Sequence, residues 1–440
     1  MEPAGKAVNL LPDLSEEAWQ SWAPRPELAP AFAKRCEGGR AQLGMSGGGR
    51  FECYGAWRCE ASGIRGGAAY KLLAEYRSEG VDSDPVSINM IVTWMDKDGG
   101  WLRREYIDAY ADREDGVREL NKTVQSPPKA CSAKVELEYR WSATGTVSWM
   151  KAALTAARTV TRRPVNIVTT YISPYTDHRE RLSDNLQRML DAVDRAGEHR
   201  ADLICFSETM YDRCSGCSLD EVAQPIPGEL TEAIGRKAKQ VRSYIVLNMH
   251  EKDGDCFYVT SVLIGRSGEI VGKYRKTHLP LFEAQAGITP GSDYPVFETD
   301  FGTIGLLICW DISFPETARL LRMQGAEIVC LSTAGEGLTQ QIARAVDNGL
   351  YLVVAGINGN MIAGDNGEPM SDPNGSPSRI INPAGEILAE IGCVDGIAHA
   401  RVDLNAKFES YWMSVGPAFG EARSLFHRER RPDTYGKLSV

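Results

Sequence analysis

The chain has 440 residues, of which 43% are hydrophobic and 25% are charged. This length and composition are typical of a globular protein with two or three domains. The formal net charge of -10 argues against binding to nucleic acid or to an anionic membrane surface. No apolar stretch approaches the roughly 18 residues of a membrane span, and the first residues lack the basic segment and apolar block of a secretory signal. We therefore expect a cytoplasmic protein.

The eleven cysteines have no regular spacing, which favours reduced thiols in such a chain. Cys214 and Cys217 form the only close pair. Because no second cysteine pair or histidine pair accompanies them, a coincidence in a loop is favoured over a zinc or redox site.

Residues 1–155 consist of short β-type segments separated by Gly, Asp and Pro, and seven of the nine tryptophans lie before residue 150. The stretch Asp96–Trp101 (DKDGGW) is typical of a hairpin turn, because Asp-Gly and Gly-Gly adopt positive φ at low cost. No long helical pattern interrupts these segments. The region is therefore predicted to be an antiparallel β-sandwich.

Residues 156–164 are predicted to be a linker, and residues 165–440 alternate between apolar strands and amphipathic helices. VNIVTTYI is a β-branched run, and a helix follows with Ser183 as its expected N-cap. Further helices are expected at LTEAIGRKAKQV, PETARLLRMQGA and TQQIARAVDNG, and hairpins are expected to turn at Arg266–Gly268 and Pro383–Gly385. Such alternation predicts an α/β fold in which helices cover the sheets.

Three of the apolar strands run into residues that can take part in catalysis. ADLICF is followed by Ser207-Glu208, EIVGKY by Arg275-Lys276, and GLLI by Cys309. Each alone has an ordinary interpretation, as a solvated carboxylate, a solvated amine or a small core residue. Together they supply a thiol, a base for its proton and a cation for an oxyanion, which is what a nucleophilic hydrolase requires.

The residues after Cys309 favour the catalytic interpretation. Ser313-Phe-Pro-Glu316 fits a capping box, with Ser313 as N-cap and Pro315 in the first helical turn. A strand that passes through a tight turn into a helix lifts the residue at its end out of the sheet. The N–H of Trp310 is then a candidate donor to an oxyanion.

The blocks FSE, GKYRKTHLP and GLLICWDISFPE, in this order and with their flanks, resemble the nitrilase superfamily of carbon–nitrogen hydrolases over about residues 164–440. The resemblance implies an αββα four-layer sandwich that dimerises through its outer helices, with no metal and no organic cofactor. It implies that Cys309 is the nucleophile, Glu208 the general base and Lys276 the oxyanion-stabilising cation together with the Trp310 N–H. Glu283 corresponds to a second glutamate of the family, although the segment from His278 to Glu283 is shorter than is usual.

YRKTHLP with CWDxxFPE resembles the amidase and N-carbamoyl amine hydrolase branches. The implied reaction is hydrolysis of a linear amide or carbamoyl group through a thioester on Cys309, with release of ammonia. A nitrile substrate is the runner-up, and a binding protein that has lost catalysis is the alternative of another class. Tyr211 and Glu336 are expected to line the substrate pocket, and Arg213 is a candidate for binding a substrate carboxylate.

The β-rich first 155 residues weakly resemble the galactose-binding-like sandwich of carbohydrate-binding modules. Their tryptophans are candidates for a sugar-stacking platform, although burial in the core is the expected use for most of them. A saccharide is thus a possible partner of this module. A structural role beside the hydrolase domain is the alternative.

Overall fold

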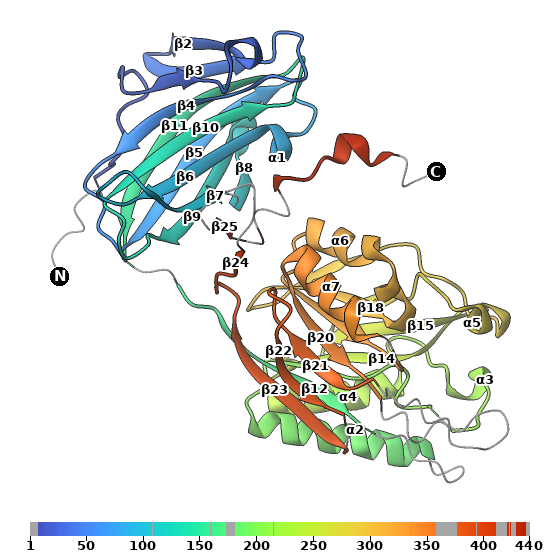
Figure 1. Ribbon diagram of the computed structural model, residues 1–440. Helices are drawn as coiled ribbons and strands as arrows, with labels where there is room; N and C mark the ends of the chain where they lie inside the picture. The colour runs from blue at the N-terminus through green and yellow to red at the C-terminus, as the bar shows by residue number, and fades with distance from the viewer. Residues whose placement is uncertain are drawn as a thin grey trace. The chain divides into compact units, whose positions relative to one another are not determined.

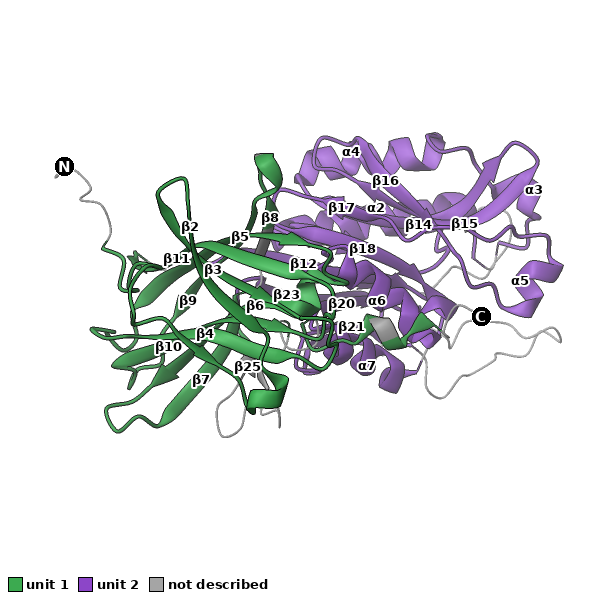
Figure 2. Cartoon of the chain, turned by 90° about the horizontal axis from the view of Figure 1, so that it is seen from above, with its two compact units in different colours: residues 1–161, 407–440 green, residues 162–406 purple. Residues whose placement is uncertain are grey.

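The computed structural model describes residues 8–107, 109–158, 161–172, 181–213, 215–335, 337–357, 376–392, 394–410, 420, 421, 423 and 428–436. The chain divides into two compact units (Figure 2): unit 1 contains residues 1–161 and 407–440, and unit 2 contains residues 162–406. No helix in the described part of the chain is long and apolar enough to cross a membrane.

Unit 1 is built from two antiparallel sheets (Figure 1). In spatial order, the first contains β1 (Gln20–Trp22), β4 (Tyr54–Ala61), β10 (Ser132–Arg140), β6 (Ile88–Met95) and β7 (Trp101–Ile107). The second contains β2 (Ala31–Glu37), β3 (Arg40–Ser46), β11 (Thr146–Ala157), β5 (Ala69–Glu79), β9 (Arg118–Gln125) and β8 (Ala109–Asp112). Alternate residues of both sheets enter one apolar cluster, which includes Leu72, Trp94 and Leu137, as expected for strands with one buried face.

The other elements of unit 1 are short. They are η1 (Pro26–Leu28), α1 (Asp84–Ser87), η2 (Glu114–Gly116), the paired strands β24 (Glu409–Ser410) and β25 (Gly420–Glu421), and η6 (Pro432–Thr434).

Unit 2 contains two mixed sheets. In spatial order, the first contains β16 (Ile270–Arg275), β15 (Cys256–Ile264), β14 (Tyr244–Asp253), β13 (Leu203–Cys205), β12 (Pro164–Tyr171) and β23 (Gly396–Asp403). The second contains β17 (Val296–Glu298), β18 (Thr303–Ile308), β19 (Ile328–Ser332), β20 (Tyr351–Ala355), β21 (Ser378–Ile381) and β22 (Ile387–Ile391). The strands in the middle of each sheet, β12–β13–β14 and β18–β19–β20, run parallel. They are almost fully buried, which explains their continuous apolar sequences.

Helices cover the outer face of each sheet of unit 2. On the first sheet lie α2 (Arg181–Glu198) and α4 (Glu229–Val241), whose Leu230, Ile234 and Ala238 are buried at helical spacing. On the second lie α6 (Pro315–Met323) and α7 (Leu338–Asn348). Shorter helices are α3 (Leu219–Val222), α5 (Leu281–Gln285) and η3 (Cys309–Ser313).

The two sheets of unit 2 face each other. Thr169 Oγ1 donates to Val354 O at 2.7 Å, and Ser332 Oγ donates to Phe206 O at 2.7 Å, in each case from one sheet to the other. Unit 2 therefore has the order of layers helix, sheet, sheet, helix.

The three predicted hairpins are confirmed. Their turns place Gly99, Gly268 and Gly385 at positive φ, which glycine adopts without strain. Both predicted N-caps are wrong. Ser183 lies inside α2, which begins at Arg181, and Phe314 is the N-cap of α6 because Ser313 is the last residue of η3.

The C-terminal end of the chain differs from the prediction of one hydrolase domain over residues 165–440. From Lys407 onward the chain belongs to unit 1. The physical reason is a buried ion pair: Lys407 Nζ lies 2.5 Å from Glu105 Oε2 on β7. The Arg428 carbonyl also accepts a hydrogen bond from Arg140 on β10 at 3.1 Å.

Candidate active site

Glu208 lies in the turn that follows β13, and its side chain is buried. Its Oε1 accepts a hydrogen bond from Lys276 Nζ at 2.9 Å. Thr209 has a left-handed φ of 45°, which is costly for a β-branched residue. The Thr209 N–H donates to Asn248 Oδ1 at 2.9 Å, so a buried side chain of the neighbouring strand β14 holds the turn in this conformation.

Lys276 is the first residue after β16 and has no exposed surface. Its ammonium lies between two carboxylates, because Nζ also donates to Glu283 Oε1 of α5 at 2.7 Å. Gly291 shapes this position: its N–H donates to Lys276 O at 2.8 Å, and a Cβ there would come within 2.2 Å of Arg275 O. Only a glycine lets the chain after α5 pass this close to the lysine.

Cys309 follows β18 directly and is the first residue of η3. It has a φ of 43°, a left-handed conformation that costs a non-glycine residue about 1–3 kcal/mol and is typical of functional sites. Its thiol lies close enough to Glu208 to contribute to the lowered pKa of that carboxyl. Glu208 and Lys276 come from the first sheet of unit 2 and Cys309 from the second, so the facing sheets bring the three predicted residues together.

The charges of the site keep Glu208 and Lys276 ionised. Burial alone raises the pKa of Glu208, but the Lys276 ammonium and the Arg213 guanidinium outweigh it, and the pKa lies below its ordinary value. Burial alone lowers the pKa of Lys276, but Glu208, Cys309 and Glu283 outweigh it, and that pKa is raised. The pKa of Glu283 is raised, first by burial and also by Glu208, although the Lys276 ammonium opposes this.

Asp311 connects the turn that carries Lys276 to the turn that carries Cys309. Its Oδ2 accepts from the Tyr274 hydroxyl at 2.7 Å and from the Ile308 N–H at 3.0 Å. Its Oδ1 accepts from the Thr277 hydroxyl at 3.2 Å and from the His278 N–H at 3.1 Å. The sequence pattern indicates no role for Asp311. Its place directly after Cys309-Trp310 was the only available signal, and that signal does not name the partners.

The other predicted site residues lie at different distances from this cluster. Trp310 is 41% exposed, and its ring meets the Phe314 ring edge-on. Tyr211 is half-buried and packs against the apolar core of the first sheet, and burial raises the pKa of its hydroxyl. Glu336 lies outside the described residues. Arg213 lies against Glu208, with Nη2 3.4 Å from Oε2.

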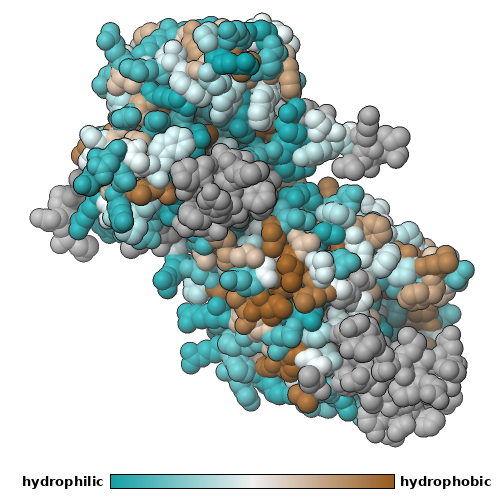
Figure 3. Space-filling model, in the orientation of Figure 1, coloured by the Kyte–Doolittle hydropathy of each residue, from teal (hydrophilic) through white to brown (hydrophobic). Residues whose placement is uncertain are grey.

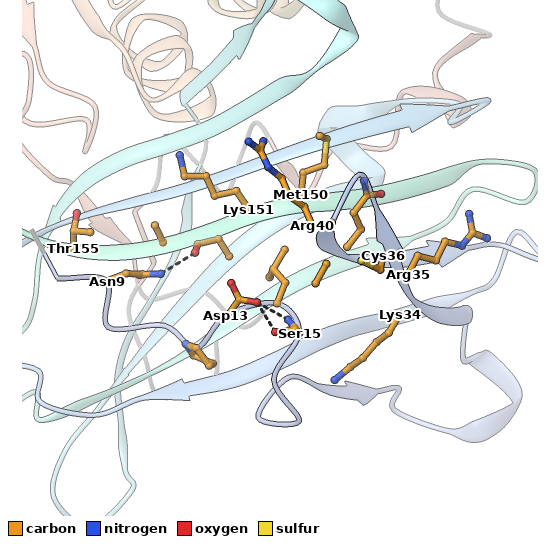
Figure 4. Close-up of a pocket in the computed structure, with 17 residues that line it drawn as sticks. Asn9, Asp13, Ser15, Lys34, Arg35, Cys36, Arg40, Met150, Lys151 and Thr155 are labelled. Atoms are coloured by element: carbon orange, nitrogen blue, oxygen red, sulfur yellow. Dashed lines mark hydrogen bonds between the residues drawn. The ribbon is translucent and has the colours of Figure 1, made fainter. Parts of the chain in front are cut away.

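Unit 1 contains a separate groove of about 1130 Å³ beside strands β2, β3 and β11 (Figure 4). Its lining includes four basic residues: Lys34, Arg35, Arg40 and Lys151. None of the lining residues is aromatic. Four of the tryptophans, Trp19, Trp57, Trp94 and Trp149, are instead buried in unit 1. Among the described residues of the chain, no group of three or more His, Cys, Asp or Glu side chains could hold a metal ion.

Comparison with known proteins places unit 2 in a family. Omega-amidase NIT2 of Homo sapiens is 28% identical over 258 residues, which are 55% of this chain and 90% of that protein. Omega-amidase NIT2 of Xenopus tropicalis is 29% identical over 238 residues, covering 50% of this chain and 84% of that protein.

Among solved structures, an amidase from Nesterenkonia sp. is 22% identical, with 64% of this chain and 99% of that chain covered and a TM-score of 0.49. Saccharomyces cerevisiae Nit3, described as a member of branch 10 of the nitrilase superfamily, is 24% identical. The match covers 55% of this chain and 90% of that chain, with a TM-score of 0.46.

The family model for carbon-nitrogen hydrolases matches residues 172–406, more than half of the chain and nearly all of unit 2. The matched range contains Glu208, Lys276, Glu283 and Cys309. The chain belongs to the carbon-nitrogen hydrolase family.

Proposed function

We propose that the protein hydrolyses a linear amide or an N-carbamoyl compound at a non-peptide C–N bond, with Cys309 as nucleophile and release of ammonia. One observation carries the proposal: a fully buried lysine is held between two carboxylates. One of them, Glu208, lies close enough to the Cys309 thiol for the thiol to contribute to its lowered pKa. This arrangement supplies a nucleophile, a base and a cation at one point. The omega-amidases among the relatives support the choice of an amide.

In the first half of the reaction, the Glu208 carboxylate takes the thiol proton while the Cys309 sulfur attacks the carbonyl carbon. A free thiol with a pKa near about 8.5 is mostly protonated at neutral pH, so an adjacent base is required. The developing oxyanion is stabilised by the Lys276 ammonium and the Trp310 N–H. Because Lys276 is excluded from water, its charge acts on the oxyanion with little screening.

In the second half, the C–N bond breaks and Glu208 returns its proton to the departing nitrogen, so that ammonia leaves. The acyl group remains as a thioester on Cys309. Glu208 then deprotonates a water molecule, which attacks the thioester carbonyl. The C–S bond breaks, the thiol regains its proton and the carboxylic product leaves.

Glu283 favours an amide over a nitrile. Its Oε1 binds Lys276, whereas its Oε2 is buried and has no hydrogen-bond partner in the described part of the chain. A buried acceptor without a partner is costly. The N–H₂ group of an amide or a carbamoyl substrate offers a donor to this oxygen, but a nitrile nitrogen carries no hydrogen.

The test is a screen for ammonia release from aliphatic amides, N-carbamoyl amines and nitriles, including the butyramide named with the Nesterenkonia amidase. Cys309→Ala should lose activity by at least about 1,000-fold, because removal of a nucleophile leaves only binding and electrostatic effects. Cys256→Ala, which removes another half-buried thiol of unit 2, is the matched control. Equal ammonia release by wild type and Cys309→Ala would contradict the proposal.

Trapping of the acyl group separates the alternatives. Intact-protein mass spectrometry of an amide reaction quenched in acid should show wild type heavier by the acyl group, and Cys309→Ala unchanged. Ammonia from nitriles but not from amides would favour the runner-up substrate. No turnover of any class would favour a binding protein that has lost catalysis.

Two further predictions remain proposals. The predicted dimer would use outer helices, and Leu320 and Met323 of α6 and Leu338 of α7 are exposed. Figure 3 shows hydrophobic side chains gathered on one face of unit 2. The predicted dimer is tested by comparing the sedimentation of wild type with that of the Leu320→Lys variant. Saccharide binding by the galactose-binding-like sandwich proposed for unit 1 is tested on a glycan array, where no binding would reject it.

A further inference from the structure

Arg213 lies five residues after Glu208 and bonds to the same turn. Its Nε donates to the Glu208 carbonyl at 3.2 Å, its Nη2 lies 3.4 Å from Glu208 Oε2, and Nη2 also donates to Thr209 Oγ1 at 3.2 Å. Its own N–H donates to the Thr209 carbonyl at 2.9 Å. The side chain is only 20% exposed. The guanidinium thus already binds three oxygen atoms of the protein.

We infer that Arg213 is a positioning residue that fixes the orientation of the Glu208 carboxylate, and not an anchor for a carboxylate on the substrate. The inference rests on the proposed function, because it concerns the general base of that reaction. It replaces the role in substrate binding that the sequence suggested for Arg213.

The two oxygens of Glu208 have different cationic partners. Oε1 accepts from Lys276 Nζ, and Oε2 faces the guanidinium of Arg213. With an ionic contact at each oxygen, the carboxylate plane cannot turn without losing one of them. The proton acceptor therefore stays oriented while Cys309 gives up its proton, which is the kind of preorganisation that proton transfer requires.

Arg213 also holds the strained turn that carries the base. Thr209 is in the left-handed region, with a φ of 45°. Its N–H is held by Asn248, while its hydroxyl and carbonyl are held by Arg213. A base mounted on a strained turn needs such bonds to keep its geometry.

The charged groups near Glu208 come from several elements. They are Arg213 on its own turn, Lys276 after β16, Glu283 on α5, Cys309 at the start of η3 and, next to Glu283, His250 on β14. Lys276 and Arg213 lower the pKa of Glu208. Loss of Arg213 removes one of these two cations, so the pKa of Glu208 should rise. The acid limb of the kcat/KM profile should then move to higher pH.

The experiment compares wild type, Arg213→Gln and Arg213→Lys, with Arg236→Gln as the matched control on the exposed face of α4. Profiles of kcat and KM against pH are measured with a neutral amide and with an amide of similar length that carries a free carboxylate. Arg213→Gln should lower kcat about 10- to 100-fold on both substrates, as misplaced catalytic groups do. Arg213→Lys should keep the acid limb near its wild-type position, because it retains the charge, but should recover only part of kcat, because it lacks the forked geometry.

The results of this experiment distinguish a positioning role of Arg213 from a role in substrate binding. A higher KM for the carboxylated amide alone, with kcat and the pH profile unchanged, would make Arg213 a substrate anchor and overturn the inference. An unchanged profile in both variants would also overturn it. If wild type releases no ammonia from any substrate, the proposed function itself fails. If Arg213→Gln does not fold, the kcat of Arg213→Lys on the neutral amide is the test. A loss of kcat in this variant supports the positioning role, and an unchanged kcat overturns it.

Discussion

At the scale of single residues, Lys276 is the charge on which the site depends. Lys276→Met leaves Glu208 and Glu283 buried without their shared cation. Removal of one partner of a buried pair costs about 3–5 kcal/mol, so we expect the free energy of unfolding of unit 2 to fall by about this amount at pH 8. Activity should also be lost, because in the proposed mechanism the oxyanion loses its cation.

The destabilisation of Lys276→Met should depend on pH. In wild type the pKa of Glu208 is lowered, so its contribution to stability is present above its ordinary value of about 4.3 and is lost as the pH falls. Without Lys276, Arg213 alone opposes the effect of burial, so the pKa of Glu208 is higher in the mutant and the mutant gains less stability than wild type as the pH rises. Thermal unfolding of both proteins at pH 4.5 and pH 8 should show the larger difference at pH 8. Lys239→Met on the exposed end of α4 is the control, and an equal difference at both pH values would contradict the prediction.

The sequence could suggest one site for Glu208, Lys276 and Cys309, because each stands at the end of an apolar strand and the three blocks resemble those of one family. The pattern alone could not show that Cys309 comes from a different sheet. It could not identify the partners of Arg213 or Asp311. Those partners depend on side-chain directions in turns, and a turn such as Thr209 has a backbone conformation that its residue type disfavours. The short segment between His278 and Glu283 still brings Glu283 to the lysine, because α5 begins at once after Pro280.

At the scale of elements, Asp311 joins η3 to the turn after β16. Asp311→Asn replaces one acceptor oxygen by an N–H₂ donor that faces donors, so we expect a loss of about 1–3 kcal/mol in stability, the cost of an unsatisfied buried group. We also expect kcat to fall more than KM rises, because the distance between Lys276 and Cys309 is no longer fixed.

The control for this prediction is Asp347→Asn at the end of α7. Asp347 is 50% exposed and lies 3.5 Å from Arg344, whose side chain is buried. Because the Asp347 carboxylate itself is in contact with water, we expect its replacement to cost about 1 kcal/mol or less. Tyr274→Phe, which removes one of the donors to Asp311, should have an intermediate effect on stability. Urea unfolding and steady-state kinetics measure both effects. If Asp311→Asn behaves like Asp347→Asn, Asp311 does not couple the two turns.

The helices and hairpins could be predicted from the spacing of apolar residues and glycines, whereas the residues at which the helices begin could not. The apolar patterns of α4, α6 and α7 and the glycines of three hairpins were sufficient to predict those elements. The N-cap of α6 was misplaced by one residue because η3 extends through Ser313 and takes up the predicted cap. The pairing of strands into two facing sheets depends on contacts between distant segments, which the pattern of one strand does not contain.

At the scale of the whole molecule, the chain leaves unit 1 at residue 161 and returns to it at residue 407. Glu105 and Lys407 are 302 residues apart in sequence. The composition of residues 407–440 does not indicate this return, so the sequence assigned them to the hydrolase domain. The contacts that these residues make, Lys407 with a fully buried glutamate and the Arg428 carbonyl with Arg140, explain why the end of the chain belongs to unit 1.

Lys407→Met tests this attachment. Glu105 also accepts from Arg103 Nε at 2.8 Å and from Trp94 Nε1 at 3.2 Å, and its pKa is lowered although burial alone would raise it. Loss of Lys407 should therefore lower the free energy of unfolding of unit 1 by up to about 3 kcal/mol at pH 7. The effect should shrink as the pH falls below the ordinary pKa of a glutamate, about 4.3, toward the lowered pKa of Glu105.

Tryptophan fluorescence can follow this unfolding, because every tryptophan except Trp310 lies in the ranges of unit 1. Lys129→Met, at an exposed position of unit 1, is the matched control. The proposed amide hydrolysis should be unchanged in Lys407→Met, because Lys407 follows the last residue of unit 2. A stable unit 1 with lost activity would mean that residues 407–440 act on the hydrolase, and would reverse the assignment of the chain end.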